Sequence, residues 1–163
     1  MLRKILIKIY RLSLVKSASL LLCINLASII LFGIFSAIFD IDVNGDVERI
    51  AGESFLYDLL LLCVVAPLLE TYIFQWLIYN MFESQFRKKL FLCCLLGGCI
   101  FGIVHLTSLM YIVVASFTGF LFLLWYALFA RKYNNFTAFC TIAIVHALSN
   151  SFPLFLNYFA YYW

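Results

Sequence analysis

Residues 66–75 read A-P-L-L-E-T-Y-I-F-Q and place one carboxylate, Glu70, inside an apolar run. The run covers residues 59–82, 24 residues with no other charge, and this length suits a helix that crosses a bilayer. An ionised side chain at the bilayer centre costs at least about 2.5 kcal/mol on insertion scales, so such residues mark functional sites by default. A protonated carboxylate that only hydrogen-bonds a neighbouring helix is the alternative interpretation.

The composition indicates an integral membrane protein. The 163 residues are 66% hydrophobic and only 12% charged, against about 25% charged in an ordinary soluble domain. This length leaves room for a single membrane domain, residues 1–163. The net charge of +3 does not indicate nucleic-acid binding, because the basic residues flank apolar runs and form no separate patch. The six cysteines fall inside apolar runs without a C-x-x-C pair, so we expect no disulfide and no metal bound by thiols.

The apolar runs predict an all-α, polytopic transmembrane bundle of about five spans. A basic amphipathic leader at residues 1–16 suits an anionic leaflet surface, and residues 40–58 form the one sizeable polar loop. A tight turn is expected near Thr107 and Ser108, and the aromatic end up to Trp163 has the composition of an interfacial belt. The expected spans are residues 17–39, 59–82, 90–107, 109–130 and 133–160.

Charge is shared unevenly between the two sides of this predicted bundle. Ten of the eleven basic residues flank one side, and six of the eight acidic residues fall on the other. The positive-inside rule therefore puts the N-terminus in the cytoplasm and the C-terminus outside. We expect a multi-pass protein of a cell membrane, and the small number of spans favours a bacterial cytoplasmic membrane.

The only two histidines, His105 and His146, also lie inside expected spans. At 1.5 Å of helical rise per residue, Glu70 lies about 20 Å from the basic flank, His146 about 21 Å and His105 about 24 Å. Three ionisable side chains on three helices therefore share one depth. His146 and Asn150 are four residues apart, so both side chains can address a single point. Ordinary helix-to-helix hydrogen bonding is the alternative for each histidine and for Asn150.

Three short motifs occur in order on successive expected spans. They are E-T-Y-I-F-Q from Glu70, F-G-I-V-H from Phe101 to His105, and H-A-L-S-N from His146 to Asn150. They resemble E-E-x-x-x-R, F-x-x-x-H and H-x-x-x-N of the CAAX-protease and bacteriocin-processing (CPBP, or Abi) family of intramembrane proteases, which is related to the type II CAAX prenyl endopeptidase. The resemblance covers about the last hundred residues.

The first motif departs from the family pattern at two related positions. Thr71 and Gln75 stand where the family has a glutamate and an arginine, four residues apart as in an ion pair along one helix face. Removing one partner would leave an unpaired charge in the membrane, whereas replacing both with neutral groups need not. We therefore interpret Thr71 and Gln75 as a coordinated variant.

The resemblance implies an intramembrane endopeptidase acting on a peptide or membrane-protein substrate within the lipid bilayer. Glu70 and His105 would activate a water, and His146 and Asn150 would stabilise the oxyanion, without a cofactor. In one alternative Glu70, His105 and His146 bind zinc as two histidines and one carboxylate. In another, motivated by Thr71 and Gln75, the chain is a non-catalytic immunity or scaffold protein that binds a peptide partner. A proton or ion carrier is the third alternative.

Overall fold

The computed structural model describes residues 2–39, 54–105 and 108–162, and every regular element in these ranges is a helix. The predicted all-α bundle is therefore confirmed. Most of the expected polar loop, Thr107 of the expected turn, and Trp163 of the aromatic end lie outside the described residues. The elements are α1 (Leu2–Arg11), α2 (Leu14–Phe39), α4 (Phe55–Leu60), η1 (Leu61–Val65), α5 (Ala66–Glu70), η2 (Thr71–Leu77), α6 (Ile78–Met81), α7 (Glu83–Ile103), α8 (Leu109–Lys132) and α9 (Asn135–Tyr162).

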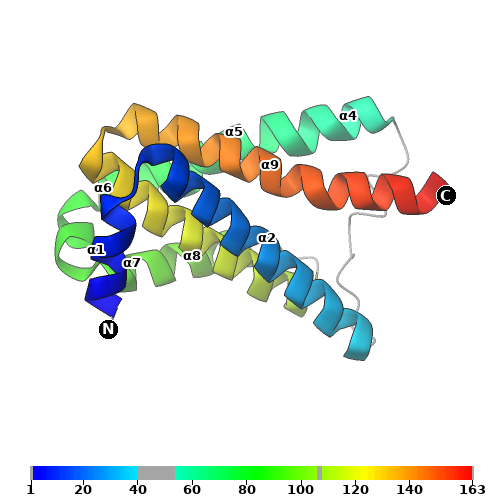
Figure 1. Ribbon diagram of the computed structural model, residues 1–163, viewed down its shortest axis with the longest axis horizontal. Coiled ribbons are helices and arrows are strands. Elements are labelled where there is room, and N and C mark those ends of the chain that lie inside the picture. The colour runs from blue at the N-terminus through cyan, green and yellow to red at the C-terminus, as the bar shows by residue number, and fades with distance from the viewer. Residues whose placement is uncertain (1, 40–53, 106–107, 163) are drawn as a thin grey trace.

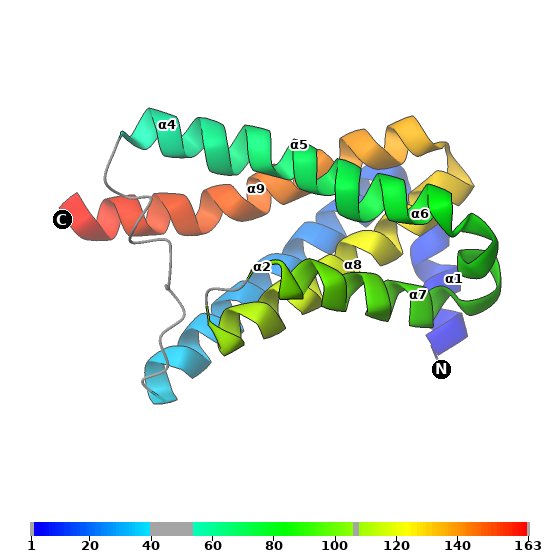
Figure 2. The ribbon, with the colours of Figure 1, turned by 180° about the vertical axis from the view of Figure 1, so that it is seen from behind.

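Helix α8 occupies the centre of the bundle, as Figures 1 and 2 show. It packs against α7, α9 and α2, and every residue from Leu121 to Phe129 is buried. A helix that is apolar all round its circumference belongs in such a position. The segments α4 to α6 form one continuous helix that runs beside α9 in the opposite direction (Figure 2). The ring of Phe55 at its start contacts Phe155 and Tyr158 near the end of α9, with ring centroids 5.5 and 4.5 Å apart.

Within the described residues, four helices have the length, the hydropathy and the low number of charges expected of a membrane span: Leu14–Phe39, Phe55–Met81, Leu109–Lys132 and Asn135–Phe159. The expected span at residues 90–107 is not among them. Helix α7 begins with a charged stretch, has non-helical backbone angles at Lys89 and ends at Ile103. Its apolar part, residues 90–103, rises only about 21 Å, less than the roughly 30 Å hydrocarbon core. The chain is a multi-pass bundle as predicted, and in the described ranges four helices, where five spans were expected, meet all of these criteria.

Helix α7 packs closely against α8 because two glycines, Gly98 and Gly102, face it. A Cβ atom on Gly98 would lie 2.6 Å from the carbonyl oxygen of Ser116, and one on Gly102 would overlap the Ser116 side chain. Small residues four apart allow two helix backbones to approach in this way. The close contact fixes the end of α7, which carries Phe101 and leads directly to His105.

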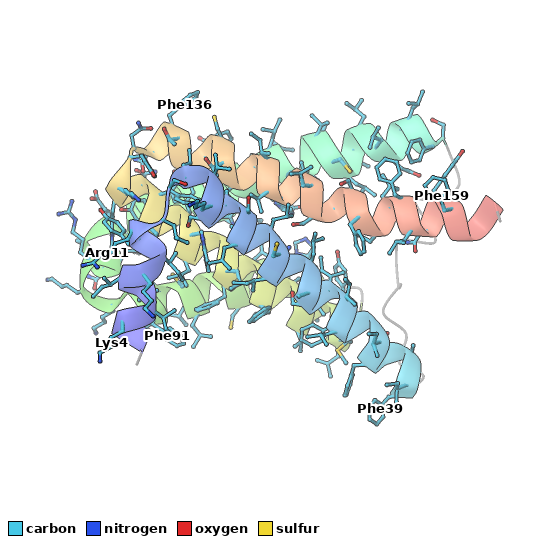
Figure 3. The ribbon with its side chains drawn as sticks, viewed as in Figure 1. Lys4, Arg11, Phe39, Phe91, Phe136 and Phe159 are labelled. Atoms are coloured by element: carbon cyan, nitrogen blue, oxygen red, sulfur yellow. The ribbon has the colours of Figure 1, made fainter. Side chains whose placement is uncertain are left out.

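The basic residues of the described ranges gather at one end of the bundle, here called the basic end. Figure 1 shows α1, the turn from α6 to α7 and the turn from α8 to α9 together at this end, and Figure 3 labels Lys4 and Arg11 there. Lys132, the last residue of α8, donates hydrogen bonds of 2.6 Å to the carbonyls of Tyr10 and Leu12. These bonds tie the C-terminal end of α1 to the bundle. The segments at this end carry Lys4, Lys8, Arg11, Arg87, Lys88, Lys89, Arg131 and Lys132, and Lys16 follows in the first turn of α2.

Candidate active site

The helix that carries Glu70 is underwound on both sides of it. The π-helical segments η1 and η2 flank α5, which ends at Glu70. Their hydrogen bonds run from residue i to i+5, so their turns hold more than the 3.6 residues of an α-helix. Buried residues consequently recur at every fourth position: Cys63, Pro67, Thr71, Gln75 and Tyr79. In an uninterrupted α-helix this stripe would rotate by about 40° at each step.

Glu70 belongs to a second, partly buried stripe beside the first. This stripe contains residues 62, 66, 70, 74 and 78, and the remaining positions are mostly exposed apolar side chains. Glu70 therefore lies at the border of the buried face and does not point towards the lipid.

Two histidines from other parts of the fold lie close to the carboxylate of Glu70. Its Oε2 atom lies 3.5 Å from Nε2 of His146 on α9 and 3.8 Å from Nε2 of His105, just beyond α7. The side chains of Glu70 and His105 are 24% and 21% exposed, whereas that of His146 is only 4% exposed. A water can bridge atoms at these separations with ordinary hydrogen bonds of about 2.8 Å. Glu70 and the two histidines are thus close enough for one water to bridge them.

Phe101 orients the ring of His105. The Nδ1 atom of His105 lies 2.7 Å from the carbonyl oxygen of Phe101, and this acceptor requires a hydrogen on Nδ1. In the neutral ring, Nε2 then presents its lone pair towards Glu70. The phenyl ring of Phe101 lies 4.5 Å from the His105 ring and 6.1 Å from the His146 ring, centroid to centroid. Phe74 of η2 holds Phe101 edge to face at 5.1 Å.

The buried surroundings of His146 favour the opposite assignment of its hydrogen. Its ring packs against Phe122 of α8 with centroids 4.8 Å apart, and within the described residues its Nδ1 atom has no hydrogen-bond partner. Burying an N–H without an acceptor is costly, so the hydrogen is better placed on Nε2, where Glu70 can accept it. His146 therefore faces Glu70 with an N–H, and His105 faces it with a lone pair.

Asn150 on α9 donates a hydrogen bond of 2.9 Å to the carbonyl oxygen of Leu62 in η1. This carbonyl needs a donor from another helix. The N–H of Ala66 goes to Leu61, and the next donor in the π register is Pro67, which has no N–H. Asn150 thus joins α9 to the underwound helix, and its second amide hydrogen is left for another acceptor.

Thr71 and Gln75, which replace the family's charged pair, are both fully buried on the stripe of period four. Among the described residues, Oγ1 of Thr71 and both polar atoms of Gln75 have no hydrogen-bond partner. An unpaired buried polar group costs about 1–3 kcal/mol. Within the described residues, these two side chains thus form no hydrogen bond that replaces the family's ion pair.

The zinc alternative uses the same three side chains. Ligands about 2.1 Å from a tetrahedral zinc ion lie about 3.4 Å from one another. The 3.5 Å between Glu70 and His146 is close to this value, but the 3.8 Å to His105 exceeds it. No group of three or more His, Cys, Asp or Glu within the described ranges is arranged to hold a metal ion. We keep zinc only as an alternative to be tested.

Sequence reasoning missed Leu62, Phe74 and Phe122 as parts of the site. Each is apolar, and each acts through its backbone or its ring face, which no residue pattern distinguishes from ordinary membrane-helix packing. The one available signal was Pro67, five residues after Leu62, and it becomes informative only once the π register is known.

Comparison with known proteins identifies one family. Residues 52–152, 101 of the 163, match the family model described as Type II CAAX prenyl endopeptidase Rce1-like. The matched range contains all three motifs and hence Glu70, His105, His146 and Asn150. No curated protein and no solved structure matches the chain.

Proposed function

Because this chain belongs to the Type II CAAX prenyl endopeptidase Rce1-like family, we propose that it is an intramembrane endopeptidase in which Glu70 and His105 activate the hydrolytic water. The observation that supports this assignment is the convergence of Glu70 with the Nε2 atoms of His146 and His105 at 3.5 and 3.8 Å. The family supports a membrane protease acting on a peptide or protein. The glutamate mechanism and the role of each residue are our proposal.

The first step is attack by a water bound between Glu70 and His105. The water donates one hydrogen to the Glu70 carboxylate and the other to the lone pair on Nε2 of His105, which leaves an oxygen lone pair free. As this oxygen bonds to the peptide carbonyl carbon, its proton passes to Glu70, the general base. The Phe101 carbonyl keeps the hydrogen of His105 on Nδ1, so the ring stays in the accepting tautomer.

The negative charge then develops on the peptide oxygen. Its donors are the second amide hydrogen of Asn150 and the Nε2–H of His146, which is released from Glu70 when the carboxylate takes the proton of the water. Removing one such donor typically lowers kcat about 100- to 1,000-fold. Glu70 next gives its proton to the leaving nitrogen, and the C–N bond breaks to yield a carboxylic acid and an amine. Water is the only co-reactant that these steps consume.

The proposal is tested by Glu70→Gln in protein reconstituted into lipid vesicles. A peptide pool prepared from bacterial membranes is added, and new peptide termini are identified by mass spectrometry. Wild type should generate new termini, and Glu70→Gln should do so at least about 100-fold more slowly, as expected for loss of a general base. Glu83→Gln is the matched control, because Glu83 is an exposed acid that pairs with Arg87 at the basic end. Equal cleavage by Glu70→Gln and wild type would refute the assignment.

A non-catalytic peptide-binding protein is the second candidate, and the neutral residues Thr71 and Gln75 at the positions of the family's glutamate and arginine favour it. In that case neither wild type nor Glu70→Gln would produce new termini, while wild type would retain specific peptides during affinity purification.

Zinc dependence has a separate test in the same assay. Cleavage that is lost on chelation and recovered with added zinc would replace the glutamate mechanism with a metal mechanism at the same three residues.

A further inference from the structure

A cavity of about 570 Å³ opens at the basic end of the bundle, away from Glu70. Its walls come from the end of α6, the start of α7, the end of α8 and the start of α9, and this volume is typical of ligand sites. Tyr79 in its wall lies nine residues after Glu70 along the same helix, about 13 Å away by helical rise. The cavity is thus separate from the candidate active site, and nothing in the proposed mechanism uses it.

Contacts with neighbouring side chains fix two of the residues that line this cavity, Tyr79 and Asn135. Tyr79 is only 3% exposed, and its ring packs against Phe86 and Tyr126 with centroids 5.2 and 5.5 Å apart. Asn135 at the start of α9 donates a hydrogen bond of 2.8 Å to Asn80 of α6. Because these contacts join the four helix ends, the cavity exists before any ligand arrives.

The mouth of the cavity is cationic. Arg87 and Arg131 both line it, and Glu83 offsets one of their charges through an ion pair of 2.7 Å with Arg87. The hydrogen bond from Arg87 to Glu83 raises the pKa of the Arg87 guanidinium, so this group stays charged. Among the described residues, Arg131 has no carboxylate partner within ion-pair distance. Guanidinium groups bind phosphate oxygens through paired N–H donors.

Large exposed apolar residues are direct or near neighbours, along the chain, of residues that line the cavity. Met81 and Phe82 precede the lining residue Glu83, and Phe136 follows the lining residue Asn135; they are 66%, 49% and 77% exposed. A ligand with an anionic head and apolar chains would contact both the arginines and these surfaces. The basic end is also the end that faces an anionic leaflet under the positive-inside rule, where basic pockets between membrane helices bind lipid head groups.

We propose that this cavity binds the phosphate group of an anionic membrane phospholipid, with Arg87 and Arg131 as its principal ligands. The bound lipid links the ends of α6, α7, α8 and α9, and it therefore stabilises the folded bundle. This site is independent of the protease assignment.

The test measures thermal unfolding of the purified full chain in detergent against added lipid. The probes are phosphatidylglycerol, phosphatidylcholine and inorganic phosphate. Phosphatidylglycerol should raise the midpoint of wild type, phosphatidylcholine should raise it much less, and phosphate should have little effect. The concentration of phosphatidylglycerol that gives half of the shift should rise about tenfold in Arg131→Gln and further in Arg87→Gln/Arg131→Gln, since each loses charge-assisted hydrogen bonds.

Lys88→Gln is the matched control, because Lys88 is an exposed basic residue of α7 outside the cavity lining. It removes the same charge and should keep the wild-type response. An unchanged response in the double variant, or an equal loss in Lys88→Gln, would overturn the proposal. An equal shift with inorganic phosphate would overturn the lipid as the ligand. Unfolding midpoints without added lipid show whether each variant folds, and all three substituted residues are exposed.

Discussion

Replacing Asn150 with alanine should destabilise the bundle, and replacing Pro67 with alanine should remove most of that effect. Asn150→Ala leaves the Leu62 carbonyl without a donor, because the N–H of Ala66 is already used and Pro67 has none. Hydrogen bonds between membrane helices contribute about 0.6 kcal/mol on average and up to about 1.7 kcal/mol, and an unpaired buried carbonyl costs about 1–3 kcal/mol. We therefore expect Asn150→Ala to lower the free energy of unfolding by about 1–2 kcal/mol.

Pro67→Ala restores an N–H in the π register of Leu62. In that background the carbonyl has a donor in its own helix, so Asn150→Ala should cost about 1 kcal/mol less than in wild type. The four proteins form a double-mutant cycle, and unfolding in mixed detergent micelles titrated with sodium dodecyl sulfate gives each free energy. Ser149→Ala is the control, because among the described residues the Ser149 hydroxyl bonds only to the Val145 carbonyl of its own helix, at 2.9 Å. Equal costs of Asn150→Ala in both backgrounds, within about 0.5 kcal/mol, would refute the role assigned to the Leu62 carbonyl.

Three further predictions follow from contacts around the site. Gly102→Ala should lower the free energy of unfolding by about 1–3 kcal/mol, because the new Cβ clashes with Ser116. Gly33→Ala is the control, because no atom lies within 4 Å of its Cβ, and equal melting midpoints of the two variants would contradict the prediction. Gln75→Leu should leave the free energy of unfolding unchanged or raise it by up to about 2 kcal/mol, because it removes two unpaired polar atoms and keeps a similar side-chain volume. A clear drop in melting temperature would instead show that Gln75 has a buried partner such as water. Phe101→Leu keeps the carbonyl that orients His105 but removes the ring that contacts both histidines. We therefore expect kcat to fall about tenfold or more with little change in KM, and an unchanged kcat would exclude a positioning role for the ring.

The helical bundle and the meeting of Glu70 with two histidines could be predicted because each depends on counting along a helix. Distance from the basic flank depends only on residue number and rise, so Glu70, His105 and His146 were expected at one depth, and the structure brings their side chains within 4 Å. The number of span-forming helices was less predictable. The expected turn near Thr107 and Ser108 agrees with the end of α7 at Ile103 and the start of α8 at Leu109. The helix nevertheless begins in the charged stretch at Glu83, so every 18-residue window of α7 contains Arg87, Lys88 and Lys89 and exceeds the charge expected of a membrane span.

The surroundings of the site could not be predicted, because they depend on the rotation of one helix relative to another. Asn150 was expected to address the same point as His146, yet its amide is bonded to Leu62, since a π-helical segment followed by proline leaves that carbonyl free. The residue pattern of this run does not predict a π-helical segment. Likewise, Thr71 and Gln75 suit a hydrogen-bonded replacement for two charges, and only the structure reveals that their polar atoms are buried without partners.

The spacing of four residues between buried positions makes the helix of residues 55–81 sensitive to its length. Inserting one residue between 61 and 65, where the π-helical turns already hold more than 3.6 residues, would turn Glu70 by about 100° relative to the preceding segment, away from both histidines, without altering any side chain of the site. Substitutions on the lipid-facing positions leave that alignment intact. Related proteins should therefore differ in this segment by substitutions, and insertions and deletions should be confined to the loops that join the segment to its neighbours.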